Sequence, residues 1–160
     1  VLHATLERAT VRPSGLVHLD GAYRFLTPDC SHGRLAEETK LLQEIVGTLR
    51  NHLECPVTVK IRVQEAGRSA TLNYARMLQD AGASVVAVHG RTREQRGALQ
   101  GAPSWEEIAA VKQALSVPVL ANGGIFSRSD VDRCMAATGA DGVLVGEALL
   151  ENPALFEGHR

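Results

Sequence analysis

The sequence predicts an α/β protein that forms roughly the last four βα units of a (β/α)8 TIM barrel, preceded by an irregular segment. Three observations carry this prediction. From about residue 35 onward, short apolar runs alternate with amphipathic stretches. The runs begin roughly 25 to 35 residues apart, the repeat expected of βα units. The chain of 160 residues contains four such runs, whereas a closed barrel takes about 250 residues.

The predicted strands are short and rich in β-branched residues, as is typical of parallel strands buried on both faces. They cover residues 57–61, 84–89, 118–122 and 142–146. Pro56 and Pro118 stand at the entry of two of them, where a missing backbone N–H costs little.

The predicted helices show apolar residues at helical spacing. Their apolar stripes fall within residues 41–49, 72–81, 108–115 and 131–135. Ser104 followed by Glu107 predicts a capping box at the start of the third helix. Gly82 and Gly139 stand where a glycine ends a helix.

Residues 1–34 show no clear period, and we leave them unassigned as a segment separate from the barrel unit at 35–160. Turn signals occur at 13–15 and 27–29, and 22–26 has the composition of a weak strand. Val1 stands where an initiator Met would be, and no signal-peptide pattern follows, which suggests a fragment or a processed chain.

The composition limits the kinds of partner expected for this chain. A net charge of −1 excludes a whole-protein attraction to nucleic acid, so any RNA contact must use a local patch. Three cysteines without metal-ligand spacing predict a reduced, intracellular setting and no metal site. No apolar run approaches the ~18 residues of a membrane span, so we expect no membrane partner.

Polar or glycine residues close all four predicted strands. Lys60, His89, Asn122 and Gly146 are expected at one level, where βα proteins bind ligands. Each has a simpler explanation, because a strand-end lysine can reach solvent, a histidine can be a satisfied core residue and Asn-Gly-Gly can be a turn. Four such residues at one level favour a ligand site.

Glycines after the last two strands suggest how that site would bind phosphate. Gly123 and Gly124 let the backbone approach a ligand without a Cβ in the way. Gly146 and Glu147 open a short helical stretch whose backbone N–H groups would face an anion.

The residue motifs at the strand ends indicate a particular protein family more specifically than the spacing of the strands does. The phrases are Val57–Arg62, Val88–Gln95, Ala121–Ile125 and Asp141–Gly146, with Asn152–Phe156 behind them. In this order they resemble signatures of the tRNA-dihydrouridine synthases over approximately residues 35–160. The phrases at 97–105 and 153–158 look most like the eukaryotic branch that modifies the tRNA D-loop.

The resemblance implies an FMN cofactor at the barrel mouth and NAD(P)H as the reductant. Lys60 matches the lysine beside the flavin pyrimidine edge, where its charge would stabilise the anionic reduced flavin, and His89 matches the histidine that hydrogen-bonds the isoalloxazine. Positions that cradle the ribityl phosphate are matched by Asn122, Gly123, Gly124, Gly146 and Glu147. The family often has Asp at Gly124 and Arg at Glu147, and a Glu there should weaken phosphate affinity.

A local cationic group is the best candidate for a contact with the tRNA partner. Arg62, Arg91 and Arg93 follow the strand ends and are expected to meet the RNA backbone. Arg96 is as well explained as a solvated loop arginine.

The family's catalytic residue has no match. Its members carry a Gly-Cys-Pro loop about forty residues before the strand lysine, and the region near Gly21 holds no cysteine. Cys30 lacks the flanking Gly and Pro and is a weak candidate, since a lone cysteine before a helix is more often structural. We therefore expect this chain to be inactive by itself, although the parent activity is FMN-dependent reduction of tRNA uridine to dihydrouridine.

Two alternatives remain open: another FMN barrel oxidoreductase similar to dihydroorotate dehydrogenase, and a non-catalytic truncated isoform or degenerate paralogue that binds RNA or a partner. We expect a cytoplasmic location, with the nucleus as the alternative. Half a barrel also exposes two strand edges, so self-association is expected.

Overall fold

The computed structural model describes residues 9–11, 17–19, 35–95 and 97–157, with side chains from residue 39 onward. Two short strands come first, β1 (Ala9–Val11) and β2 (Val17–Leu19), and helices then alternate with strands. The strands are β3 (Thr58–Arg62), β4 (Val85–His89), β5 (Val119–Asn122) and β6 (Gly142–Leu144). The helices are α3 (Leu35–His52), α4 (Arg68–Asp80), α5 (Trp105–Ala114), α6 (Arg128–Thr138) and α7 (Glu147–Glu151), with 3-10 turns at Gly97–Leu99 and Leu155–Glu157.

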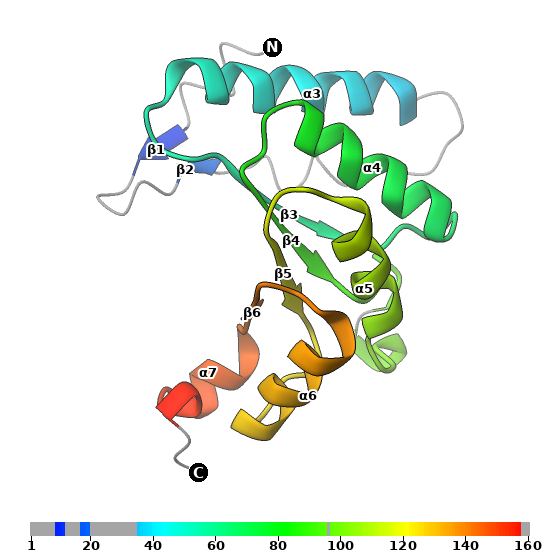
Figure 1. Ribbon diagram of the computed structural model, residues 1–160, viewed down its shortest axis with the longest axis vertical. Helices are drawn as coiled ribbons and strands as arrows, with labels where there is room; N and C mark the ends of the chain where they lie inside the picture. The colour runs from blue at the N-terminus through cyan, green and yellow to red at the C-terminus, as the bar shows by residue number, and fades with distance from the viewer. Residues whose placement is uncertain (1–8, 12–16, 20–34, 96, 158–160) are drawn as a thin grey trace.

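The four later strands form one parallel sheet in the order β3-β4-β5-β6, which confirms the predicted partial barrel. Each connection between neighbours contains a helix, as parallel pairing requires. The helices α4, α5 and α6 lie side by side along one side of the sheet, and α3 packs against α4 (Figure 1). Strands β3 and β6 form the two edges of this sheet.

The face of the sheet that meets the helices carries the core. Side chains alternate along a strand, so every second residue points to this outer face. Val86, Val88, Val119 and Ala121 have no exposed surface there, and Ile108 and Val111 of α5 cover them with none exposed either. The opposite, inner face presents Thr58, Lys60 and Leu120, which keep part of their surface exposed.

The helix ends correct one prediction and confirm another. Ser104 does cap α5 by accepting a hydrogen bond from the Glu107 N–H, but the Glu107 carboxylate turns away to Arg68, so the capping box is incomplete. A complete box occurs instead at α6, between Ser127 and Asp130. Gly139 ends α6 in the left-handed conformation, as expected of a helix-ending glycine.

The amino-terminal segment contains an antiparallel pair that the sequence did not suggest. Strand β1 pairs with β2, and the predicted turn at 13–15 falls in the stretch between them. That turn, the one at 27–29 and the weak strand at 22–26 lie outside the described residues. Helix α3 begins at Leu35, the first residue of the predicted barrel unit.

Among the described helices, none has the length and the apolar content needed to cross a membrane.

Candidate active site

The carboxyl ends of the parallel strands bring one row of side chains together on the inner face. The register pairs Arg62 with His89, His89 with Asn122, and Asn122 with Leu144. The backbone continues the row, since the Val63 N–H donates to the His89 carbonyl and the Gly90 N–H to the Asn122 carbonyl, at 3.2 and 3.1 Å. His89 and Asn122 therefore lie at one level, as predicted.

The prediction that Lys60 and Gly146 share this level is wrong. Lys60 pairs with Ala87, which places it one inward-facing position before His89, and Arg62 occupies the row instead. Strand β6 ends at Leu144, so Gly146 lies two residues beyond the row, at the start of α7. The shift arises because the conspicuous residue of each apolar run does not mark its register, which depends on pairing with the neighbouring strand.

Positive charge surrounds the imidazole of His89. Burial makes the largest contribution to lowering its pKa, followed by the charges of Arg62, Lys60 and Arg91, and together they bring it from 6.5 to about 4. Lys60 keeps an exposed side chain, yet the protein around its ammonium removes enough water to lower its pKa, and Arg62 adds to that effect. At neutral pH the site therefore combines a neutral imidazole with three cationic side chains, an arrangement that suits an anionic ligand.

Arg91 is the most buried of the predicted RNA-binding arginines. It is only 6% exposed, and its Nε donates to the Gly101 carbonyl at 3.0 Å. Its Nη1 lies 3.3 Å from His89 Nε2. A guanidinium held in this way lies within the inner-face site, and its predicted contact with RNA stays a prediction.

The other two predicted RNA-binding arginines are more accessible. Arg62 is half-buried and donates from Nη1 to the Thr92 carbonyl at 2.7 Å, which ties the end of β3 to the loop after β4. Arg93 is also half-buried. Their role in RNA binding stays a prediction.

Gly123 and Gly124 follow β5 with backbone φ angles of 106° and 73°, which residues that carry a side chain rarely adopt. A Cβ at Gly123 would stand 2.8 Å from His89 Cδ2, and one at Gly124 would stand 2.7 Å from Pro103 Cγ. Trp105 Nε1 donates to the Gly123 carbonyl at 3.1 Å. The two glycines thus allow the loops after β4 and β5 to close tightly around the histidine.

The remaining predicted cofactor residues, Asn122, Gly146 and Glu147, differ in their contacts. Asn122 donates from Nδ2 to the Leu144 carbonyl at 2.6 Å, which links the ends of β5 and β6. Gly146 immediately precedes α7 and has open space where a Cβ would be, and Glu147, the first residue of α7, is exposed. Burial and the charge of Arg62 lower the pKa of Arg91, and the Glu147 carboxylate partly opposes this shift, so its negative charge reaches the site.

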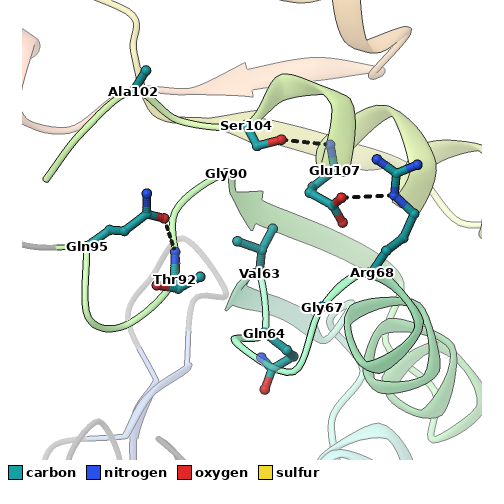
Figure 2. Close-up of a pocket in the computed structure, with 10 residues that line it drawn as sticks. All are labelled: Val63, Gln64, Gly67, Arg68, Gly90, Thr92, Gln95, Ala102, Ser104 and Glu107. Carbon is teal, nitrogen blue, oxygen red and sulfur yellow. Dashed lines mark hydrogen bonds and ion pairs between the residues drawn. The ribbon is translucent and has the colours of Figure 1, made fainter.

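A separate cavity of about 230 Å³ lies beside the same strand ends (Figure 2). Val63 and Gly90, each one residue beyond the inner-facing row, line it together with the Arg68–Glu107 ion pair, whose Nε–Oε1 distance is 2.9 Å. The Gln95 side chain also borders it and accepts from the Thr92 N–H at 2.8 Å. None of the predicted cofactor residues lines this cavity, so it is distinct from the inner-face site.

The cysteines of the described ranges stand apart from the site. Cys134 is buried in α6, where burial raises the pKa of its thiol, and Cys55 precedes β3. The weak candidate Cys30 lies outside the described residues. Within the described part of the chain, no cluster of three His, Cys, Asp or Glu side chains could hold a metal ion.

Sequence reasoning missed the residues that support the site from behind. Gly101, Pro103 and Trp105 contact Arg91, Gly124 and Gly123 respectively. The sequence did indicate this segment, because the motif at 97–105 resembles the eukaryotic branch of the family. The contacts of its residues could not be predicted, because they depend on how the loop after β4 folds against the end of β5.

Comparison with known proteins agrees with this architecture. Residues 33–160 match the family described as Dihydrouridine synthase (Dus). The chain is 49% identical over 125 residues to a tRNA-dihydrouridine(16/17) synthase [NAD(P)(+)]-like protein of Rattus norvegicus, and this match covers 78% of the chain and 28% of the relative. A tRNA-dihydrouridine(16/17) synthase [NAD(P)(+)] of Schizosaccharomyces pombe is 44% identical over 76% of the chain and 31% of its own length.

Among solved structures, a phosphonopyruvate hydrolase complex superposes with a TM-score of 0.59 over 85% of this chain and 50% of that chain. At 15% identity this likeness concerns the fold alone. The chain thus spans less than a third of the length of the two synthases above, and its fold matches half of a larger α/β enzyme.

Proposed function

Because this chain belongs to the dihydrouridine synthase family, we propose that it supplies the carboxyl-terminal half of an active site that reduces uridine in tRNA to dihydrouridine with FMN and NAD(P)H. The observation that carries the proposal is the inner-face row of Arg62, His89 and Asn122, bordered by Lys60 and Arg91. It places cations and a neutral imidazole at the strand ends where barrels of this architecture bind ligands.

The side chains present suit FMN in charge and shape. Lys60, Arg62 and Arg91 supply positive charge for an anionic group, and Gly123 and Gly124 leave the backbone uncovered. When bound, FMN would supply reversible two-electron chemistry. Lys60 would favour negative charge at the pyrimidine edge of the ring system, and His89, uncharged at neutral pH, would form a hydrogen bond to it.

The phosphate end fits less well. The proposed cradle comprises Asn122, Gly123, Gly124, Gly146 and Glu147, and the exposed Glu147 carboxylate would repel a phosphate. Glu147 would therefore contact the phosphate through its backbone N–H, with its carboxylate turned to solvent.

The names of the rat and yeast relatives specify positions 16 and 17 of tRNA. We extend that substrate class to the protein in which this half-site works. Arg62 and Arg93 would contact the RNA backbone at the mouth, whereas Arg91 would act inside the site because it is buried.

A sheet of four strands does not close into a barrel, so the described chain encloses its ligand on one side only. Affinity for a cofactor depends on a largely enclosed pocket. We expect the isolated chain to hold FMN weakly and to lack turnover, and a yellow protein with stoichiometric FMN after dialysis would contradict this.

Within the described ranges, β3 and β6 are the edge strands of this sheet, and edge strands can template pairing with another chain. We therefore expect the isolated chain to self-associate. A compact monomer at micromolar concentration in analytical ultracentrifugation would show that the edges are covered.

The test of function is a chimera in which residues 33–160 replace the matching segment of the rat relative. The chimera should retain FMN and form dihydrouridine in tRNA with NAD(P)H. Lys60→Ala in the chimera should lower flavin retention or reduction, whereas the control Arg76→Gln, an exposed residue of α4, should not. A chimera that retains FMN but acts on a free pyrimidine instead of tRNA would favour the alternative, an oxidoreductase similar to dihydroorotate dehydrogenase.

A further inference from the structure

Arg91 is held on two sides by groups of its own protein. Its Nε donates to the Gly101 carbonyl at 3.0 Å, and its Nη1 meets His89 Nε2 at 3.3 Å. With 6% of its surface exposed, its guanidinium has little contact with water. The planar fork of arginine can make both contacts at once, which a lysine ammonium cannot do with the same geometry.

The contact with His89 determines where the imidazole carries its proton. A guanidinium has five N–H donors and no acceptor. In a hydrogen bond to Arg91, His89 Nε2 must therefore accept, and a neutral ring then carries its proton on Nδ1. A doubly protonated ring would place an N–H against an N–H and add a positive charge beside Lys60, Arg62 and Arg91.

Gly123 restrains the same edge of the ring. A Cβ added there would stand 2.8 Å from His89 Cδ2 and 3.0 Å from Nε2, so the ring lies directly against the Gly123 backbone. That backbone is fixed in turn by the Trp105 Nε1 bond to the Gly123 carbonyl. Together, Arg91 and Gly123 hold the Nε2–Cδ2 edge of the imidazole and leave Nδ1 as its remaining hydrogen-bonding atom.

We propose that Arg91 is a positioning residue that fixes His89 in the Nδ1–H tautomer, so that the histidine offers a hydrogen-bond donor to its ligand. The inference rests on the proposed function for the ligand, and it deepens that function by giving Arg91 a role inside the site. The ligand atom opposite Nδ1 is accordingly a hydrogen-bond acceptor, such as a carbonyl oxygen or an unprotonated ring nitrogen.

Charged groups from every neighbouring element bear on this ring. Lys60 and Arg62 approach from β3, Arg91 from the loop after β4, and β5 contributes the neutral Asn122 at the paired position. Glu147 of α7 acts on Arg91 and strengthens its cationic form. The set favours a neutral His89 over the whole physiological pH range.

The experiment is long-range 1H–15N NMR of the imidazoles in the intact chain, without flavin or tRNA, with His89→Gln used to assign the His89 signals. We expect the Nδ1–H tautomer and a titration midpoint near pH 4. Arg91→Gln should let the Nε2–H tautomer appear, because the glutamine amide can accept as well as donate, and should raise the midpoint by a fraction of a pH unit, because one charge is removed. Arg91→Lys should keep the midpoint closer to that of the parent chain and still mix the tautomers.

Arg76→Gln, which removes one charge from an exposed position on α4, is the matched control and should change neither reading. An Nε2–H ring in the parent chain would overturn the proposal, and so would a tautomer that both Arg91 variants leave unchanged. If Arg91→Gln fails to fold, as judged from its amide spectrum, Arg91→Lys decides alone. Because no ligand is present, these outcomes are independent of whether the site binds FMN.

Discussion

The two faces of the β3–β6 sheet differ in what they bury. The outer face is apolar and closed, with Val86, Val88 and Val119 entirely covered by the helices. The inner face carries Lys60, which is exposed, and Arg62, His89 and Asn122, which are half-buried. Folding therefore draws its hydrophobic stabilisation from one face, and the chemistry concentrates on the other, where buried apolar area is small. Substitutions on the two faces should separate stability from site geometry.

The largest expected effect is on the outer face. Ile108→Ala in α5 should lower the free energy of unfolding by about 2–5 kcal/mol, because Ile108 has no exposed surface and its truncation leaves a cavity. Urea unfolding followed by circular dichroism measures the change. Leu99→Ala, at a residue that is 73% exposed, is the control and should stay within about 0.5 kcal/mol of the parent chain. Equal losses for both variants would mean that the helix layer is not the core.

A smaller effect is expected where the inner face meets the β5–α6 loop. Gly123→Ala combines a positive φ of 106° with a contact at 2.8 Å from the His89 ring, so we expect a loss of about 1–3 kcal/mol and a moved imidazole signal. Gly67→Ala is the matched control, since Gly67 has a φ of 94° with nothing within 4 Å. It should show the backbone cost alone and leave the His89 signal in place. If the His89 imidazole signal moved in both variants, the close packing of Gly123 against the His89 ring could not be the cause.

The smallest expected effect lies in the first turn of α6, where Asp130 caps the helix. The pKa of the Asp130 carboxylate is lowered from 3.8 to about 2, first by its hydrogen bond from Arg133 and then by those from the Ser127 hydroxyl and the Phe126 N–H. Because the pKa is depressed in the folded state, its stabilisation is complete above about pH 4 and is lost as the pH falls through 2. Asp130→Ala should cost about 1–2 kcal/mol at pH 7 and flatten this acid dependence.

Asp132→Ala serves as the control for Asp130, because Asp132 lies on the same helix with 69% of its side chain exposed. Its ion pair with Arg128 should contribute less than about 0.5 kcal/mol. Equal costs for the two variants in denaturant titrations would show that the capping interactions of Asp130 are not special.

The sequence predicted the outer face better than the inner one, for a physical reason. Burial of a strand and of a helix stripe leaves a local period, so 58–62, 85–89 and 119–122 could be located to within about two residues. The level of Lys60 could not be predicted, since a one-position register difference depends on pairing with Ala87 of another strand.

Long polar side chains escaped prediction for a related reason. Arg91 finds its partners at His89 and Gly101, and Glu107 leaves its own helix start for Arg68, 39 residues away in the chain. Such pairings follow from how loops fold over strand ends and leave no periodic trace in the sequence. His89 and Asn122 were identified because the ends of parallel strands meet at one edge of the sheet.

The most direct test of the account is an amide NMR titration of the chain with FMN up to millimolar concentration. If the inner face is the flavin site, weak binding should shift the signals of Lys60, Arg62, His89 and Gly123, and Lys60→Ala should reduce those shifts. The signals of Gln64, Arg68 and Gln95 should stay in place, because they line the separate cavity of about 230 Å³, here called the outer cavity. Shifts confined to the outer cavity, or shifts at the inner face that Lys60→Ala leaves unchanged, would contradict the assignment of the inner face as the active site.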